Sequence, residues 1–306
     1  MFEAQKLVFY SCVSPVHMGA GQAIGVIDNP IQREVHTGHP LIAGSGIKGA
    51  VRHHLTRMWK DRRLISRLFG PESNASDHAG AIAFTDATLV TFPVRSLRNT
   101  FVHATCPSAL ARLKRLAGGG VPWVVPATVA DGSASVASAS SITGKRLLLE
   151  VFDFEATDSS DVKTIGEWLA TNALPLGEEH EFFRNKLRSD LVVLSDTEFA
   201  HFVRNATVVE AHVRIDDKTG AAAKGALFYT ENLPPESLLA GLVMASVERR
   251  KNSDSDDLFD ADRVLSAVLN DDGERLGLLD RLLQVGGDAT TGRGLIVIHA
   301  ASGDLL

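Results

Sequence analysis

Two short segments of the chain combine glycine with basic residues in a pattern typical of phosphate binding. The first is IAGSGIKGAVR (42–52), where Gly44 and Ser45 stand at the start of a helical pattern. Backbone amides are free to donate at a helix start, and Lys48 and Arg52 lie one turn apart on one face. The segment therefore predicts a phosphate site, although an ordinary glycine-rich helix start would give the same pattern.

The second segment is GGDATTGRG (286–294), which approaches a nucleotide-binding P-loop without completing it. Arg293 and Gly294 stand where that motif requires Lys followed by Ser or Thr. The expected order of elements also differs, because a helix is predicted before the loop and a strand after it. An ATPase is therefore not expected. The loop could still hold a phosphodiester through Gly292, Arg293 and Gly294, or it could be only a flexible turn.

The third segment is the loop 17–39, HMGAGQAIGVIDNPIQREVHTGH, which offers groups for acid–base chemistry. Asp28 precedes an Asn-Pro pair, and an Asp in that position is usually only a turn former. His17 could act as a base or donate to a phosphate, but a lone histidine is more often structural. The two cysteines, Cys12 and Cys106, form neither a CxxC pair nor a zinc-binding pattern.

The elements that would position these residues alternate between strands and helices. Ile47, Val51, Leu55 and Met58 recur at helical spacing, and Asp260 or Asp262 could cap a later helix. Further helices are expected at 108–117, 162–172, 196–205 and just before Gly286, and strands at 5–14, 80–94, 145–154, 208–216, 226–233 and after Gly294. Turn residues between 208–216 and 226–233 predict a hairpin. The pattern favours an α+β fold with an antiparallel sheet, specifically a ferredoxin-like core with insertions.

We expect a single domain over residues 1–306 with three inserted segments. The loop at about 15–46 is too long for a simple connector, and such loops are usually functional or disordered. The stretch 118–144 is biased toward Gly, Ala, Ser and Val, which is typical of an insertion with mobile parts.

The charge distribution bears on the partner. The net charge is −6, but residues 1–120 hold 14 Lys/Arg and 7 Asp/Glu, whereas residues 121–306 hold 17 and 30. This asymmetry suggests a surface for a polyanion in the N-terminal part, although a solvated basic helix face would also produce it. The apolar runs are too short to span a bilayer and no secretory signal is evident. With few cysteines, a cytoplasmic location away from membranes is expected.

Four motifs together resemble the RAMP superfamily of CRISPR proteins, and in particular the backbone subunits of type III-B (Cmr) effector complexes. They are SPVHMGAGQAIGVIDNPIQRE (14–34), HPLIAGSGIKGAVR (39–52), TGAAAKGALFYTENLPPESL (219–238) and GGDATTGRG (286–294). Each motif alone is weak, but the four in this order and spacing are specific. The resemblance covers nearly the whole chain, although residues 118–200 contribute little to it.

The resemblance implies an RRM-like, or ferredoxin-like, palm with finger and thumb elements. It also implies copies stacked along a guide CRISPR RNA with other subunits of the complex, and a thumb hairpin at about 213–232 that interrupts the duplex with a complementary target RNA. The palm residues that would grip RNA are Gly44, Ser45, Lys48, Arg52, Gly292, Arg293 and Gly294.

In these relatives a loop aspartate cleaves the target RNA with a divalent metal, Mg²⁺ or Mn²⁺, and Asp28 is the matching residue. One carboxylate cannot enclose Mg²⁺, so Asp28 would share the ion with an RNA phosphate and waters. His17, Tyr229 and Glu231 would be helpers, or only structural supports. Two alternatives remain open: a scaffold that binds RNA without cutting it, and a guide-processing ribonuclease that uses His17 as general base without metal.

Overall fold

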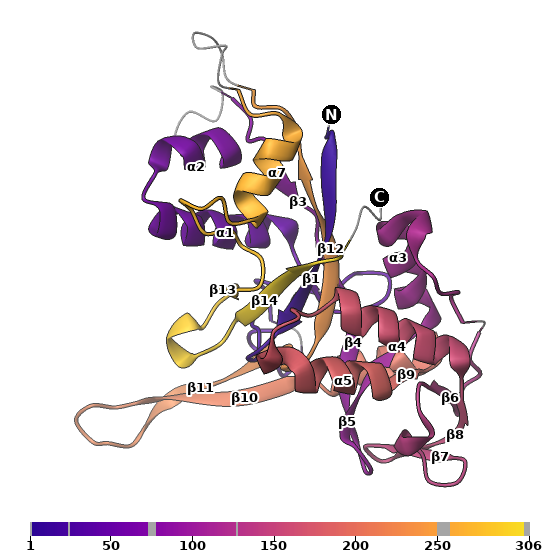
Figure 1. Ribbon diagram of the computed structural model, residues 1–306. Coiled ribbons are helices and arrows are strands. Elements are labelled where there is room, and N and C mark those ends of the chain that lie inside the picture. The colour runs from indigo at the N-terminus through magenta and orange to yellow at the C-terminus, as the bar shows by residue number, and fades with distance from the viewer. Residues whose placement is uncertain (1, 24, 73–77, 127, 250–257, 303–306) are drawn as a thin grey trace.

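The computed structural model describes residues 2–23, 25–72, 78–126, 128–249 and 258–302 and has a mixed α+β architecture (Figure 1). A twelve-stranded sheet runs through the body, and a separate two-stranded hairpin projects from it. Most strand pairs are antiparallel, and two are parallel: Thr100–Thr105 (β5) with Leu191–Val193 (β9), and Ser133–Val136 (β6) with Phe152–Asp158 (β8). The predicted α+β class and the mainly antiparallel sheet are therefore confirmed.

One part of the sheet is built around β1 (Ala4–Cys12), which pairs with β12 (Leu238–Ala245) and β14 (Leu295–Ala300). Successive side chains of a strand point to opposite faces, so Val8 and Tyr10 enter one hydrophobic core while Leu7 and Phe9 enter the other. The remaining strands of this part are β13 (Leu282–Gln284) beside β14, β3 (Ile82–Phe84) beside β12, and β2 (Leu41–Ile42) beside β4. This strand system carries the loops described below.

The other part of the sheet closes into a ring of six strands. It begins with β4 (Ala87–Ser96), which also pairs with β12. The ring continues through β5 (Thr100–Thr105), β9 (Leu191–Val193), β6 (Ser133–Val136), β8 (Phe152–Asp158) and β7 (Arg146–Leu149). Ser96 of β4 pairs with Leu149 of β7, which completes the ring. A simple ferredoxin-like sheet does not describe this barrel-like part.

Helices pack against both parts of the sheet (Figure 1). In α1 the residues Ile47, Val51 and Leu55 are buried, as their spacing predicted. Helix α7 begins at Asp260, whose side chain accepts a hydrogen bond from the Arg263 amide. The helices are α1 (Gly44–Trp59), α2 (Arg62–Phe69), α3 (Pro107–Ala117), α4 (Ser160–Asn172), α5 (Glu181–Ser189), α6 (Asp196–Asn205) and α7 (Ala261–Leu269). Within the described ranges, none of them has the length and apolar character needed to cross a membrane.

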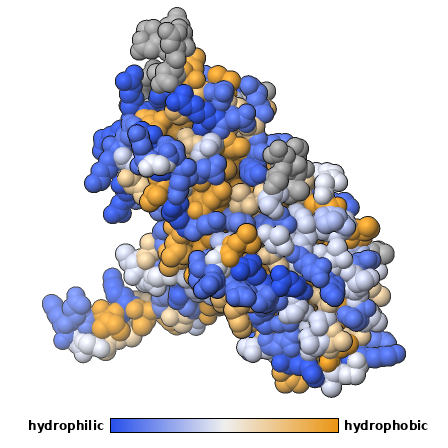
Figure 2. All heavy atoms as spheres, viewed as in Figure 1, coloured by the Kyte–Doolittle hydropathy of each residue, from blue (hydrophilic) through white to orange (hydrophobic). Residues whose placement is uncertain are grey.

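The predicted hairpin is present as β10 (Val208–Ile215) and β11 (Ala222–Asn232), which we call the thumb hairpin. It projects from the body (Figure 1), and Figure 2 shows hydrophobic side chains gathered on it. Val213 is 44% exposed and Leu227, its partner across the strands, is 57% exposed. A two-stranded hairpin is marginal alone in water, so these apolar groups indicate a surface that binds a partner.

One prediction about the middle of the chain needs correction. Residues 145–154 do not form one strand, because the chain turns between β7 and β8 at Glu150, whose φ is +53°. The stretch 118–144, predicted to have mobile parts, holds β6, which lies between β8 and β9 in the six-stranded ring. Ala134 and Val136 of β6 are buried, so this strand belongs to the core, while the interpretation of 118–144 as an insertion stays a prediction.

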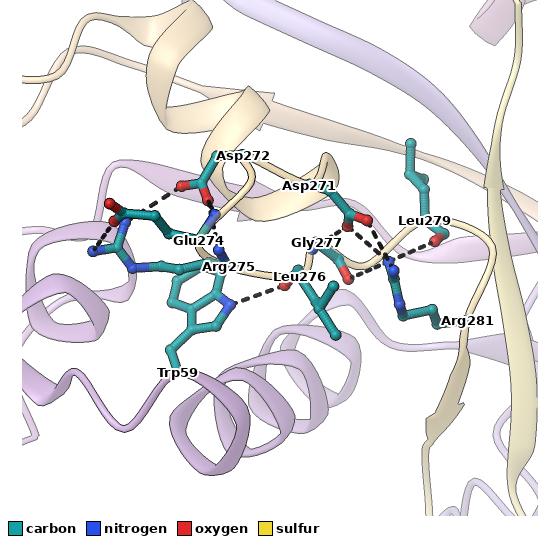
Figure 3. A network of polar contacts seen from close by, with 9 residues as sticks. All are labelled: Trp59, Asp271, Asp272, Glu274, Arg275, Leu276, Gly277, Leu279 and Arg281. Carbon is teal, nitrogen blue, oxygen red and sulfur yellow. Dashed lines mark hydrogen bonds and ion pairs between the residues drawn. The ribbon is translucent and has the colours of Figure 1, made fainter.

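The helix predicted before Gly286 was also wrong, since this segment forms an irregular turn followed by β13. Asp271 accepts a hydrogen bond from the Gly277 amide, and Arg281 pairs with Asp271 while it also donates to the Gly277 and Leu279 carbonyls (Figure 3). Trp59 of α1 donates to the Leu276 carbonyl at 2.9 Å. These side chains occupy backbone groups that a helix would pair internally. The glycine-rich loop therefore connects strands β13 and β14, whereas a P-loop leads from a strand into a helix.

Candidate functional site

The part of the loop 17–39 around Asn29 lies along the outer edge of β11 at the base of the thumb hairpin. The Asn29 amide donates to the Tyr229 carbonyl at 3.0 Å, and the Glu231 amide donates to the Asn29 carbonyl at 2.9 Å. Asn29 and Thr230 form a parallel bridge. The loop thus acts as a short third strand, which fixes the backbone on which Asp28 stands.

Asp28 is exposed, and its carboxylate is held by the thumb hairpin. Its Oδ2 accepts a hydrogen bond from the Tyr229 amide at 2.8 Å. The alternative considered above was a local turn, but the carboxylate instead caps a distant strand. Its Oδ1 accepts no hydrogen bond from any residue that the structure describes. One oxygen is therefore anchored, and the other is open to an ion or a ligand group.

Glu231 is buried and ties the loop to its surroundings. Its carboxylate accepts hydrogen bonds from the Ile31 amide at 3.0 Å and from the Thr207 hydroxyl at 2.9 Å. It also pairs with Arg33 at 2.5 Å, and Arg33 donates to the carbonyls of Gly38 and Val203. At 3% exposure, Glu231 cannot meet a macromolecular substrate directly. Its geometry is that of a clamp on the segment that carries Asp28.

His17 joins the thumb hairpin to the glycine-rich loop. Its Nδ1 lies 2.8 Å from the Glu231 carbonyl, which can only accept, so neutral His17 carries its proton on Nδ1. The His17 carbonyl accepts a hydrogen bond from the Gly287 amide at 2.8 Å. The three residues predicted as helpers thus have different contacts. Tyr229 donates a hydrogen bond to Asp28, and Glu231 holds the loop of Asp28 through Ile31 and Arg33. His17 contacts the Glu231 carbonyl and not Asp28 itself.

The loop 286–294 needs some of its glycines for packing. A Cβ at Gly286 would lie 2.2 Å from the His17 carbonyl oxygen, and one at Gly294 would lie 2.0 Å from the Val285 carbonyl oxygen. Gly292 is different, because it is exposed and nothing lies within 4 Å of its Cβ position. Arg293 forms an ion pair with Glu210 of β10. The structure therefore places this loop beside the thumb base, with Gly292 open and Arg293 held.

The start of α1 corrects one predicted contact. The Gly44 amide donates to the Asp86 carboxylate at 2.8 Å, and a Cβ at Gly44 would lie 2.3 Å from the Phe84 carbonyl oxygen. Gly44 is buried, so this glycine serves packing and its amide is not free for a phosphate. Ser45 and Gly46 are exposed on the first turn of α1, so the predicted phosphate site would consist of these two residues without Gly44.

Lys48 and Arg52 lie together on α1, as their spacing predicted, but both are half-buried. The Lys48 ammonium donates to the Ile82 carbonyl at 3.0 Å. Burial lowers the pKa of Lys48, and the nearby Arg52 guanidinium lowers it further. Arg52 lies 4.0 Å from Glu72, and its Nη2 has no hydrogen-bond partner among the described residues. This Nη2 atom is buried, so an incoming acceptor could meet it only after the side chain moves.

Sequence reasoning missed the side chains that connect these parts. Gln32 accepts from the Ala43 amide at 3.3 Å and donates to the Gly19 carbonyl at 3.1 Å, which links α1 to the loop. Glu34 pairs with Arg112 of α3, which also donates to His39 at 3.1 Å. Burial, with a smaller effect of Arg112, lowers the pKa of His39 to about 4. None of these pairs has a local signature in the sequence.

The acidic groups of the site do not form a metal cage. Among the described residues, no group of three or more His, Cys, Asp or Glu is arranged to hold an ion. Asp28 offers one free carboxylate oxygen at the thumb base. An ion here would need further ligands from a bound substrate and from water, which is a common arrangement for Mg²⁺ beside phosphates.

Comparison with known protein families identifies the family of this chain. A family model described as the RAMP superfamily matches residues 9–297. The chain belongs to the RAMP superfamily.

Individual relatives match over almost their full length. A protein of Pyrococcus furiosus named "CRISPR system Cmr endoribonuclease Cmr4" is 30% identical over 95% of this chain and 94% of its own. "CRISPR system CMR subunit Cmr4" of Saccharolobus solfataricus is 22% identical over 96% of each chain. Among solved structures, oligomeric Cmr4 from Pyrococcus furiosus superposes with a TM-score of 0.70 at 25% identity, covering 98% of this chain and 99% of that one.

Proposed function

We propose that this chain is a backbone subunit of a type III-B CRISPR effector complex that binds guide RNA and cleaves complementary target RNA at regular intervals. Support comes from the relatives named as Cmr4, one of which is called an endoribonuclease. The observation that carries the proposal is the placement of Asp28, exposed at the thumb base with one carboxylate oxygen anchored and the other free.

The sheet around β1, β12 and β14 is the counterpart of a ferredoxin-like palm in this proposal, and the projecting β10–β11 hairpin is the thumb. Copies of the chain stack along the guide RNA together with other subunits of the complex. The exposed apolar side chains of the thumb hairpin separate base pairs at each copy. Phosphates of the guide lie near Ser45, Lys48 and Arg52, and near Gly292 and Arg293.

Cleavage at Asp28 depends on holding the RNA in a reactive geometry. A nucleotide displaced from the duplex can align its 2′-OH with the adjacent phosphate, and positioning supplies much of the rate. A divalent cation, Mg²⁺ or Mn²⁺, would stabilise the charge that develops on the phosphate. The free Oδ1 of Asp28 would be a ligand of that ion, while Tyr229 and Glu231 keep the carboxylate in place.

Two other functions compete with this one. A scaffold would use the same RNA contacts, with Asp28 serving only to cap Tyr229. A metal-independent ribonuclease would use the Nε2 atom of His17 as general base, since Nδ1 is engaged by the Glu231 carbonyl. The metal requirement separates the second alternative from the proposal.

The test is cleavage of a guide-complementary RNA by the assembled complex, with Mg²⁺ and with EDTA. Asp28→Asn is the informative variant, because an amide oxygen still accepts the Tyr229 hydrogen bond while the charge is lost. We expect a regular cleavage ladder that falls at least 100-fold in this variant and in EDTA, with RNA binding unchanged. Asp153→Asn, at an exposed acidic residue of β8, is the matched control and should cleave normally.

A ladder that persists in Asp28→Asn would contradict the role of Asp28. Binding of target RNA without any cleavage by the wild type would favour the scaffold. Cleavage that continues in EDTA and stops in His17→Ala would favour the metal-independent ribonuclease.

A further inference from the structure

A cavity of about 360 Å³ lies where the thumb hairpin leaves the body of the protein. It is bounded by the end of β4, the start of β5, the start of β10 and the segment that follows β11. Its volume lies in the range of small-molecule sites. The walls include Pro93, Phe101, Val208, Pro234, Pro235 and Glu236. These rings and aliphatic groups form a largely apolar space, with Glu236 in its wall and the Arg95–Glu150 pair at its rim.

The backbone around this cavity is strained in an unusual way. Six non-glycine residues among those described have positive φ, and three of them line the cavity. These are Thr100 at 66°, Glu150 at 53° and Glu236 at 65°. Such conformations are unfavourable for residues with a Cβ and tend to cluster at ligand sites. Thr100 and Glu150 stand at the turns between β4 and β5 and between β7 and β8, so tight turns of fixed shape wall this side of the cavity.

Glu236 is the polar group in the cavity wall that lacks a partner. Its carboxyl group forms no hydrogen bond or ion pair with any residue in the described part of the chain. Burial raises the pKa of Glu236 to about 7, so near neutral pH this group both donates and accepts hydrogen bonds. At the rim, Arg95 is 81% exposed and pairs with Glu150 at 3.3 Å, a contact that a phosphate could replace.

We propose that this cavity binds a single RNA base, whose edge pairs with the Glu236 carboxyl and whose backbone phosphate lies near Arg95. The proposal rests on the RNA binding proposed above. Pockets that receive an unstacked base combine flat apolar walls with hydrogen bonds to the base edge, and carboxyl groups pair with base amino and imino groups. An apolar side chain from a second copy would instead cover Glu236 and leave it without a partner, which is unfavourable.

The position of the cavity agrees with this assignment. The loop of Asp28 runs along the outer edge of β11, whereas Val208 begins β10 on the other side of the hairpin. Two strand spacings and three residues of strand separate them, which is about 14 Å. A single RNA strand that passes Asp28 can therefore reach the cavity with a base further along the strand.

The experiment measures binding of mononucleotides to the purified full-length chain by calorimetry or saturation-transfer NMR. The probes are the 5′-monophosphates of adenosine, cytidine, guanosine and uridine, with ribose 5-phosphate as the base-free control. Ala206→Phe fills the cavity, because Ala206 lines it. Glu236→Gln keeps the size of the side chain and removes its acidity. Glu274→Gln, at an exposed surface position, is the matched control.

We expect nucleotide binding that depends on the base, with ribose 5-phosphate at least tenfold weaker. Affinity should fall at least tenfold in Ala206→Phe, and the order of base preference should change at least threefold in Glu236→Gln. Glu274→Gln should stay within twofold of wild type. Equal binding of ribose 5-phosphate, or equal affinity in wild type and Ala206→Phe, would overturn the proposal.

Two further outcomes distinguish a base-binding cavity from a contact between copies and from the cleavage site. If no mononucleotide binds, while Ala206→Phe weakens self-association in sedimentation, the cavity takes a side chain of a second copy and the base assignment is wrong. Asp28→Asn should leave mononucleotide affinity unchanged. Base binding at the cavity together with normal target cleavage in Asp28→Asn would overturn the cleavage role of Asp28 and leave the cavity assignment standing.

Discussion

Replacing Glu231 by glutamine tests whether its buried ion pair with Arg33 holds Asp28 in place. The Glu231 side chain is 4% exposed and that of Arg33 is 19% exposed, so water screens the pair only weakly. Glutamine keeps one acceptor oxygen but turns an amide group toward donors such as the Ile31 amide. Breaking a buried pair from one side costs about 3–5 kcal/mol. Because Arg33 keeps two carbonyl acceptors, we expect a loss of about 2–3 kcal/mol here.

The assay has a stability readout and a functional readout. Urea denaturation of the full chain should give the loss in unfolding free energy for Glu231→Gln. Glu210→Gln is the matched control, since Glu210 is also on the thumb and pairs with an arginine but does not touch the Asp28 loop. Its cost should stay below about 1 kcal/mol, because that pair is more exposed. In the assembled complex, Glu231→Gln should slow cleavage about tenfold or more through misplacement of Asp28.

The shape of the pH–rate profile decides how Glu231 acts. A positioning residue transfers no proton, so the profile of Glu231→Gln should match that of the wild type at a lower rate. A changed profile would mean that Glu231 titrates during the reaction. Unfolding free energy and cleavage rate both close to wild type would refute the clamp altogether.

Three further outcomes are expected. Lys48→Ala and Arg52→Ala should each weaken RNA binding equally for all RNA sequences. Each should also lower the slope of log binding constant against log salt concentration by about one unit. Filter binding over a salt series measures both, and a loss that depends on the RNA sequence would exclude phosphate contacts. Burial holds the pKa of His39 at about 4, so as pH falls His39 is protonated in the unfolded chain before it is protonated in the folded one. The free energy of unfolding should therefore drop by on the order of 1–3 kcal/mol between about pH 6.5 and pH 4. Denaturation midpoints should show this drop, and His39→Gln should reduce it. Gly294→Ala should destabilise the fold by more than about 2 kcal/mol, because of its positive φ and a clash with the Val285 carbonyl. Gly292→Ala should cost about 1 kcal/mol, from its positive φ alone. Equal thermal midpoints for the two variants would contradict the packing role of Gly294.

Local patterns predicted the elements that carry their own signals. Helix α1 shows apolar residues at spacings of four and three, and the thumb hairpin has turn residues around Gly220 between two alternating strands. The turn at Glu150 was missed because it contains no Gly, Pro, Asn or Asp, and the apolar pattern runs through it. The six-stranded ring depends on contacts such as Ser96 with Leu149, which link distant segments and leave no local trace.

In the candidate site, too, single segments were predicted from their residue types, whereas contacts between distant segments were not. The segments that contain Asp28, His17 and the glycine-rich loop were identified from their residue types, and the structure brings them together at the thumb base. The clamp could not be found, because Arg33 and Glu231 are brought together only by folding. Gly44 was misread because a glycine at a helix start suits both a phosphate and a close strand, and only packing distinguishes them.

The net charge of −6 does not argue against RNA binding once the cations are sorted by what they contact. Arg33, Arg112 and Arg293 pair with glutamates of the same chain, so they stabilise the loops and add little to the field felt by RNA. By contrast, Arg57, Lys60, Arg62 and Arg63, at the end of α1 and the start of α2, are exposed and form no ion pair with any residue in the described ranges. Charges separated by more than about 10 Å are screened at physiological salt. A phosphate chain near α1 and α2 therefore responds to the local charge, which includes the segment of Asp272 and Arg275 beside these helices, rather than to the total.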